Sequence, residues 1–438
     1  MISGYLTRRL AVLAAVSSAL LLAACGGGDD DKKSGGQTNL RAINLATDIA
    51  SVDLYTGDTK RFSALATDVP APGIGLEAAT YTLAVKRAGE TTALFSESFS
   101  LDKDRNYTAV IAGRESGLVV RTIPENEDTN GITAGSFRLR VFNLIADAGG
   151  VDVFVVPPGT VVSDSTAPTL RFTNSSLSDF QTFTTATGYR LLVTGQGNLD
   201  DVRLDIPLTG TVDKQFHTLV MTSGLSGALV NATLIPQGGT AVSLKNSKAR
   251  VRVAAGADAN GNVGATVAGT AITGTLRSPN VSPYRLVDAG DRDLTVTLNG
   301  AVVVTGTRTF AAGSDYTVLA FGSTGAPQFA LLNDDNRAPS ATTRAKIRLV
   351  NVAGGSEPMS LRADFQSLVT DVAAGTASTY FTVTSATSAR IEVSTPGAGT
   401  LYTLTSSGSQ PLLQAQGVYT LFMLGGNAAP TGQLNKDR

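Results

Sequence analysis

The sequence predicts an all-β protein with four tandem immunoglobulin-like antiparallel β-sandwich domains. Two observations support this fold class. One arginine-containing strand pattern recurs four times along the 438 residues, and short alternating apolar and polar segments follow one another between glycine-marked turns. The composition agrees, because 46 glycines and 42% hydrophobic residues suit short strands around buried cores. A chain of this length divides into several domains.

Each repeat opens with a strand centred on an arginine. The segment "LRAINLATDIASVDLY" begins at Leu40, and "LRVFNLIADAGGVDVF" at Leu139 matches it without a gap at seven positions. Related openings are "VRVAAGADANG" and "IRLVNVAGGSE". Apolar residues flank every arginine, so the alternation predicts a strand with the apolar residues facing inward and the arginine facing outward. The arginines are Arg41, Arg140, Arg252 and Arg348.

Further strands are predicted within each repeat. An aromatic and a β-branched residue open an alternating run near the end of every copy, at residues 106–110, 215–220, 315–319 and 418–422. Other strand-like segments cover residues 81–85, 189–193 and 390–393. Asn299-Gly300, inside "LTVTLNGAVVV", predicts a hairpin with a type I′ turn.

Linkers rich in polar residues, glycine or proline separate the copies at residues 125–135, 238–247 and 337–343. We therefore expect sandwich repeats at 39–130, 136–240, 247–337 and 343–434, after an N-terminal segment that is not part of a repeat. Because the linkers are short, the four units should form a string with limited bending, and a closed ring is the alternative.

The N-terminal segment has the pattern of an export signal. Two arginines precede an apolar stretch from Leu10 to Ala24, which is short for a membrane span. Leu22-Ala23-Ala24-Cys25 resembles the bacterial lipoprotein signal. This resemblance implies a signal peptide at 1–24, cleavage between Ala24 and Cys25, and a diacylglyceride and an N-acyl chain on Cys25. With Gly26 next, it also implies sorting to the outer membrane. We expect the lipidated cysteine and a flexible tether to occupy residues 25–38. The alternative is a plain secretory signal with an incidental cysteine. As Cys25 is the only cysteine, it forms no internal disulfide.

The repeat pattern resembles a bacterial domain family catalogued as domain of unknown function 4397. The resemblance rests on the arginine strand, the following Asp and Val-Asp-Val elements, and the late Tyr-Thr-Val strand. It is clearest in the first two copies. It implies a β-sandwich, export and tandem repetition, and it implies no activity.

Few residues offer catalytic or metal-binding chemistry. His217 is the only histidine and lies on a predicted strand, facing away from Phe216, so zinc sites of the usual nitrogen and sulfur type are excluded. No Gly-x-Ser-x-Gly turn or phosphate-binding loop occurs. Carboxylates remain: weak calcium candidates are Asp48, Asp53, Asp147 and Asp152, with further acids at the joints at Glu125, Glu127, Asp128, Asp334 and Asp335. Turn hydrogen bonds and solvation are the alternative roles of these acids.

The sequence therefore favours a lipid-anchored outer-membrane protein that faces the periplasm or the cell surface. We expect a non-enzymatic binding, adhesion or spacer module with an envelope or extracellular protein or glycan as partner. With 35 basic and 36 acidic residues, nucleic acid is not an expected partner. No cofactor is expected beyond the acyl chains on Cys25 and calcium at the weak candidates. The alternative function is an exported carboxylate-dependent hydrolase with its site in a divergent repeat, such as the third.

Overall fold

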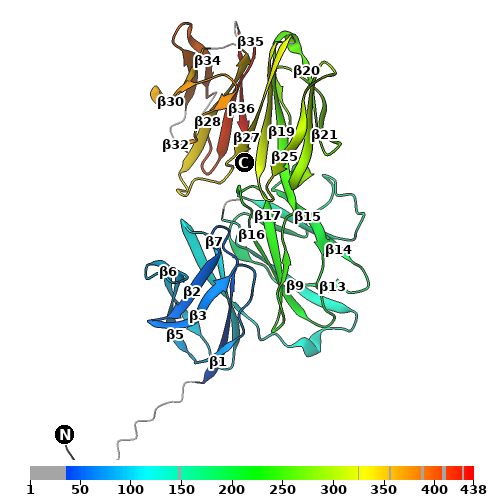
Figure 1. Ribbon diagram of the computed structural model, residues 1–438. Helices are drawn as coiled ribbons and strands as arrows, with labels where there is room; N and C mark the ends of the chain where they lie inside the picture. Colours follow the sequence, from blue (N-terminus) through cyan, green and yellow to red (C-terminus); the bar gives the residue numbers. More distant parts are fainter. Residues whose placement is uncertain are drawn as a thin grey trace, which may run out of the picture. The chain divides into compact units, whose positions relative to one another are not determined.

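The computed structural model describes residues 36–146, 149–323, 325–354, 357–385, 389–406, 411–426 and 429–438. These residues form β-strands and two short 3-10 helices, η1 (Thr129–Gly131) and η2 (Asp258–Asn260). The all-β prediction is confirmed. Figure 1 shows the strands gathered into successive groups along the chain. Four successive segments each hold two sheets, and we call these segments repeats 1 to 4.

Repeat 1 contains the sheets β4-β1-β7-β8 and β3-β2-β5-β6. Its strands are β1 (Gln37–Asn44), β2 (Ser51–Thr56), β3 (Thr59–Ala66), β4 (Ile74–Glu77), β5 (Ala79–Arg87), β6 (Ala93–Leu101), β7 (Asn106–Arg114) and β8 (Gly117–Pro124). The predicted tether extends to Thr38, but β1 already begins at Gln37, where it pairs with β4.

Repeat 2 contains the sheets β12-β9-β16-β17-β18, with β13 also on β9, and β11-β10-β14-β15. Its strands are β9 (Ser136–Asn143), β10 (Val151–Val156), β11 (Leu170–Phe172), β12 (Ser176–Leu177), β13 (Gln181–Thr184), β14 (Tyr189–Gly195), β15 (Asn198–Leu208), β16 (Phe216–Ser223), β17 (Val230–Pro236) and β18 (Val242–Leu244). The segment predicted as the second linker includes β18, which pairs with β17.

Repeat 3 contains the sheets β22-β19-β26-β27, with β23 also on β19, and β21-β20-β24-β25. Its strands are β19 (Lys248–Ala257), β20 (Asn262–Val267), β21 (Thr270–Arg277), β22 (Asn280–Val281), β23 (Arg285–Asp288), β24 (Gly290–Leu298), β25 (Ala301–Phe310), β26 (Asp315–Ser323) and β27 (Ala326–Asp334). The predicted hairpin turn is confirmed, because Asn299 and Gly300 link β24 to β25 with φ values of 50° and 83°.

Repeat 4 contains the sheets β31-β28-β35-β36, with β32 also on β28, and β30-β29-β33-β34. Its strands are β28 (Arg344–Gly354), β29 (Met359–Ala363), β30 (Gln366–Val372), β31 (Thr376–Ala377), β32 (Phe381–Thr384), β33 (Arg390–Thr395), β34 (Gly399–Thr405), β35 (Val418–Gly426) and β36 (Thr431–Lys436).

The same strand order thus recurs in all four repeats, with one difference from the predicted pairing. The first strand of each repeat runs parallel to the next-to-last long strand of the same repeat. These parallel pairs are β1 with β7, β9 with β16, β19 with β26 and β28 with β35. One sheet of each repeat is therefore mixed, whereas the prediction was antiparallel throughout. In the immunoglobulin order the first two strands share a sheet, but here β1 and β2 belong to different sheets. The immunoglobulin-like part of the prediction is not confirmed, because strand periodicity defines buried faces and not pairing partners.

Each repeat encloses its own hydrophobic core between its two sheets. In repeat 1 the core contains Leu40 and Tyr107 from one sheet with Leu54 and Leu83 from the other. Equivalent clusters fill repeats 2, 3 and 4. The flanking apolar residues of every repeated arginine are buried in these cores, as predicted from the alternation.

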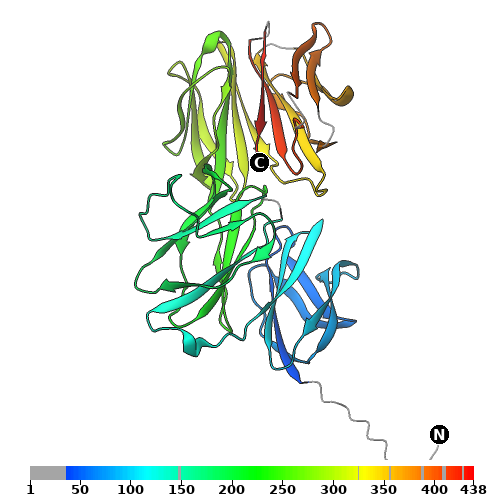
Figure 2. The ribbon, with the colours of Figure 1, turned by 180° about the vertical axis from the view of Figure 1, so that it is seen from behind.

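Two more hydrophobic clusters lie between repeats. Ile43 and Val110 of repeat 1 pack with Phe142 and Val220 of repeat 2. In the same way, Ala254 and Leu319 of repeat 3 pack with residues of repeat 4, among them Val350 and Phe422. Figures 1 and 2 show from opposite sides that β28 and β35 of repeat 4 lie beside β19 of repeat 3, in agreement with their contacts. The repeats therefore associate face to face as pairs 1–2 and 3–4, and the expectation of a simple string is wrong.

Candidate functional site: buried arginines and a cavity between repeats

The four repeated arginines project from the face of the mixed sheet opposite the core, as the strand period predicts. This face is not exposed to solvent, because the paired repeat covers it. Arg140, Arg252 and Arg348 are buried, and the side chain of Arg41 is 13% exposed. In each repeat the arginine Nε donates to a threonine hydroxyl on the neighbouring parallel strand. These threonines are Thr108, Thr218, Thr317 and Thr420.

Repeats 1 and 2 exchange arginine contacts across their interface. Arg41 donates to the carbonyl oxygens of Pro236 (3.0 Å) and Gly239 in repeat 2. Arg140 donates to the carbonyl oxygen of Pro124 in repeat 1 at 2.9 Å. Pro124 and Pro236 end the equivalent strands β8 and β17, so the exchange is reciprocal.

Repeats 3 and 4 make the same exchange with carboxylates as acceptors. Arg252 Nη1 donates to Asp437 Oδ1 in repeat 4 at 2.5 Å, and Arg348 Nη2 donates to Asp334 Oδ1 in repeat 3. Both carboxylate side chains are 0% exposed. These are fully buried ion pairs, in which loss of one partner leaves a charge without compensation.

The environment of Asp334 shows how these charges are accommodated. Burial raises the pKa of Asp334, but the nearby Arg348 and Arg252 outweigh this effect and hold the pKa below its usual value. The carboxylate also accepts hydrogen bonds from Thr317 and from the Tyr284 hydroxyl at 2.7 Å. Asp334 is therefore ionised and saturated with donors.

A second ion pair at this joint has strongly altered proton affinities. Burial lowers the pKa of Lys346 to about 8, although Asp335 lies 3.3 Å from its Nζ. Asp335 has a pKa lowered to about 2, because its hydrogen bonds with Arg337 and the charge of Lys346 outweigh burial. The joint acids Asp334 and Asp335, which the sequence suggested as calcium ligands, thus already have basic partners.

A cavity of about 800 Å³ opens where repeats 2, 3 and 4 meet. This size is within the range of small-molecule sites, about 300–1,000 Å³. Its lining contains Asp200 and Asp201 from repeat 2, Tyr284 from repeat 3, and Asn435 and Asp437 from repeat 4. The basic side chains of the lining are Arg203, Arg250, Arg252, Arg285, Lys436 and Arg438.

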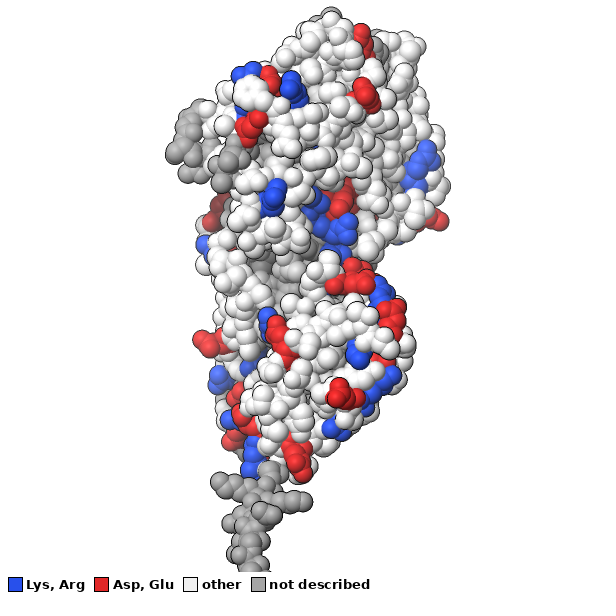
Figure 3. Space-filling view, turned by 90° about the vertical axis from the view of Figure 1, so that its left-hand side faces the viewer, with Lys and Arg blue, Asp and Glu red and all other residues white. Residues whose placement is uncertain are grey.

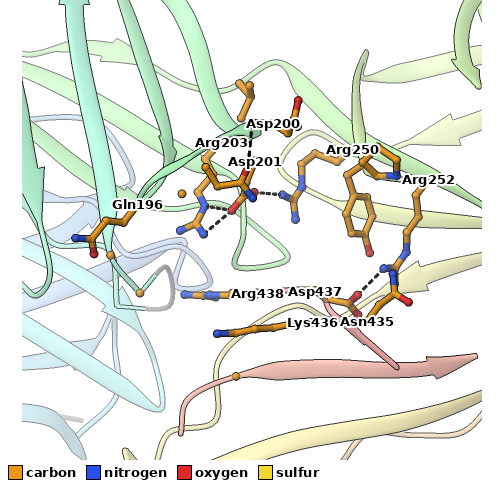
Figure 4. A pocket seen from close by; sticks show the side chains of 18 of the residues that line it. Gln196, Asp200, Asp201, Arg203, Arg250, Arg252, Asn435, Lys436, Asp437 and Arg438 are labelled. Atoms are coloured by element: carbon orange, nitrogen blue, oxygen red, sulfur yellow. Dashed lines mark hydrogen bonds and ion pairs between the residues drawn. The ribbon is translucent and has the colours of Figure 1, made fainter. Parts of the chain in front are cut away.

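Asp201 joins repeats 2 and 3 at the wall of this cavity. One carboxylate oxygen accepts from Arg203 and the other accepts from Arg250 at 2.7 Å, as Figure 4 shows. Burial raises the pKa of Asp201, but the two guanidinium groups outweigh it and the pKa is lowered. Arg250 also pairs bidentately with Asp315 and lies over the Tyr284 ring. The wall is therefore rigid and its ionised groups are fixed in place.

Among the calcium candidates that the structure describes, Asp53 and Asp152 lie in β2 and β10, and Asp48 lies between β1 and β2. Asp53 accepts from the N–H groups of Ala64 and Gly89 and pairs with Lys60 at 2.6 Å. Asp48 accepts from the N–H of Glu115 at 2.9 Å.

Asp152 makes the equivalent contacts in repeat 2, with Arg171 (2.6 Å) and the N–H of Gly197 (2.9 Å). Asp147 lies outside the described residues. Within the described part of the chain, no three His, Cys, Asp or Glu residues are grouped so that they could hold a metal ion.

At the first joint, Glu125 accepts from Arg41 and Thr108. The backbone N–H of Glu127 donates to the side-chain oxygen of Gln237, and the Asp128 carboxylate accepts from the N–H of Asn130.

His217 is fully buried in repeat 2. Its Nε2 accepts from the N–H of Val212 at 3.1 Å, and its ring packs edge-on against Phe137 with centroids 5.5 Å apart. Burial lowers the pKa of His217. The side chain is a packed strand residue and is not part of the cavity lining.

Some predicted residues fall outside the described part of the chain, namely the signal segment 1–24 with Ala24, and the lipidation candidate Cys25. Among the residues that are described, none form a helix of the length and hydrophobicity needed to cross a membrane.

The paired interfaces and the cavity were not predicted from the sequence. A signal was present, because Ala42-Ile43, Val141-Phe142 and Leu349-Val350 place apolar residues on both faces of their strands. Such runs are typical of strands buried on both sides. The cavity itself had no sequence signal, because it combines residues from three repeats.

The chain belongs to a family described as Domain of unknown function (DUF4397). The family profile matches residues 32–154 and 249–360, together just over half of the chain. These regions cover repeat 1 with the start of repeat 2, and repeat 3 with the start of repeat 4. The comparison with curated proteins gives no match.

Similarities to solved structures are weak. A candidate cell adhesion protein from Bacteroides uniformis has 11% identity and a TM-score of 0.18, covering 46% of this chain and 99% of its own. CBMbc, a family CBM26 module from Eubacterium rectale Amy13K in complex with maltoheptaose, has 10% identity and a TM-score of 0.17, covering 45% and 96%. Such low scores carry no conclusion about this chain.

Proposed function

We propose that this protein is a lipid-anchored, non-enzymatic binding module of the bacterial cell envelope, built from four β-sandwich domains. The main support is the cavity between repeats 2, 3 and 4, whose charged wall is fixed by Asp201, Arg203 and Arg250. A fixed polar recess at a junction of domains suits recognition of a polar ligand. The paired repeats hold this recess in place.

The proposed anchor rests on the sequence pattern that ends in Cys25. The test is metabolic labelling of cells with a fatty-acid analogue that can be detected after purification of the protein. We expect label on the native chain and none on the Cys25→Ser variant. Label on both chains, or on neither, would contradict the proposed lipid anchor.

The proposed location is the outer membrane, with the repeats on the periplasmic side or at the cell surface. Protease accessibility of repeat 4 on intact and permeabilised cells distinguishes the two sides. Cleavage on intact cells supports capture of an extracellular partner, and cleavage only after permeabilisation supports a partner in the periplasm. Fractionation of the protein with the inner membrane would contradict the proposed location.

The hydrolase alternative placed its site in a divergent repeat, with repeat 3 as one candidate. Repeat 3 has the same two sheets as the others, and its interior is filled by residues that include Val251, Leu294, Phe310 and Val318. We therefore do not propose catalysis. A specific hydrolytic activity lost on one Asp substitution would overturn the non-enzymatic assignment.

A further inference from the structure

We propose that the cavity between repeats 2, 3 and 4 binds an anionic saccharide. The charged group of this ligand is a carboxylate or a phosphate, and polar side chains next to that group bind the hydroxyls. The inference deepens the proposed binding function and rests on it. Its basis is a set of unused hydrogen-bonding and charged groups that line one recess.

The first group is the guanidinium of Arg252 in β19. Its Nε and Nη1 are bound by Thr317 and Asp437, but its buried Nη2 has no hydrogen-bond partner among the described residues. A carboxylate oxygen of Asp334 lies 3.9 Å from Nη2, beyond hydrogen-bond distance. A buried donor without a partner is costly. An anionic ligand in the cavity supplies the missing acceptor.

The second group is an acceptor on the same side of the recess. Asn435 in β36 lines the cavity, and its buried Oδ1 has no hydrogen-bond partner within the described part of the chain. Figure 4 shows Asn435 beside the Arg252–Asp437 pair. An unused donor and an unused acceptor together match a ligand with both an anionic oxygen and a hydroxyl group.

The third feature is the charge of the lining. Six basic and three acidic side chains contribute to it, and Asp201 and Asp437 are occupied by arginines. Lys436 is exposed and donates to the neutral Gln414, and exposed Arg285 has no acidic partner among the described residues. In Figure 4 the Lys436 side chain extends toward the part of the cavity where Gln196 lies. Figure 3 shows basic and acidic side chains close together beside a hollow near the middle of one face.

A saccharide fits these features better than a bare ion. The cavity is far larger than one phosphate or carboxylate group, and its other lining residues include the polar Gln196, Asn198 and Gln416. Side-chain amides of this kind recognise hydroxyls through paired donors and acceptors. Tyr284 does not offer a free ring face, because Arg250 and Arg252 both lie over it.

The test is calorimetric titration of the full chain with glucuronic acid, glucose 6-phosphate, glucose and inorganic phosphate at low salt. We expect one or both anionic sugars to bind at least tenfold more tightly than glucose. Preference for glucuronic acid assigns a carboxylate ligand, and preference for glucose 6-phosphate assigns a phosphate ligand. Equal binding of glucose, or no binding of either anionic sugar, would overturn the inference.

Three variants locate the binding. Arg285→Glu and Lys436→Glu reverse exposed charges of the lining, and each should weaken the anionic sugar at least tenfold. Arg277→Glu, an exposed residue of β21 outside the lining, is the matched control and should change nothing. The Asn435→Leu variant should bind the anionic sugar only as tightly as it binds inorganic phosphate. If the first two variants bind the anionic sugar with unchanged affinity, or if Asn435→Leu has no effect on this affinity, the inference is wrong. The tests of the lipid anchor and of the location do not depend on this result.

Discussion

At the scale of single residues, the repeated arginine is the feature that connects the sequence to the assembly. Arg252 and Arg348 occupy equivalent strand positions and reach carboxylates in each other's repeat. The buried ion pairs contribute specificity to the pairing of repeats 3 and 4, because an arginine without its acid remains a buried charge. Repeats 1 and 2 use backbone carbonyls for the same contact.

Asp334→Asn should destabilise the protein strongly. It leaves the buried Arg348 without its ionic partner, and breaking a buried pair costs about 3–5 kcal/mol. Urea unfolding of the full chain measures the loss. The matched control is Asp288→Asn, which breaks the solvent-exposed pair with Lys248 and should cost less than about 1 kcal/mol. Equal losses for the two variants would contradict the role of the buried pair.

The proton affinity of His217 gives a second prediction at this scale. Burial lowers its pKa from 6.5, so below that pH the unfolded chain binds a proton that the native chain does not. The free energy of unfolding should therefore fall as the pH decreases from 6.5 through the native pKa. Because His217 is the only histidine, its imidazole resonances titrate without overlap in an NMR spectrum. A midpoint at or above 6.5 would contradict the buried environment.

At the scale of strands and turns, much could be predicted from the sequence. The alternation around Arg41 and Arg140 indicated which side chains enter the core, and Asn299-Gly300 indicated a hairpin. The pairing of strands could not be predicted, because the parallel contact of β1 with β7 joins residues far apart in sequence. The cavity could not be predicted either, because Asp201, Arg250 and Asn435 come from different repeats.

The hairpin between β24 and β25 provides a prediction for this scale. Gly300 has φ 83° and no neighbouring atom would contact an added Cβ, so Gly300→Ala tests backbone strain alone. We expect a loss of about 1 kcal/mol or slightly more. Gly274→Ala is the control, since its Cβ would also meet open space but no positive φ is required. Thermal unfolding should show a lower midpoint for the first variant only, and an unchanged midpoint for Gly300→Ala would refute the turn assignment.

At the scale of the whole molecule, the repeats form two face-to-face pairs, and repeat 2 also contacts repeats 3 and 4. Ser226 donates to the carbonyl oxygen of Gly313 in repeat 3, and Arg438 of repeat 4 donates to that of Gly227. The hydrophobic clusters between paired repeats are as buried as the cores within them. Each pair should therefore unfold as one cooperative unit, because separating its two members would expose the apolar cluster between them to water.

Hydrogen exchange of the full-length Asp334→Asn variant, followed by mass spectrometry, tests this pairing most directly. The substituted carboxylate belongs to repeat 3, but its arginine partner is in repeat 4. The account predicts that amide protection falls together in β19 and β26 of repeat 3 and in β28 and β35 of repeat 4, and that repeat 1 is unchanged. Loss of protection confined to repeat 3 would contradict it and would show that the repeats are independent units.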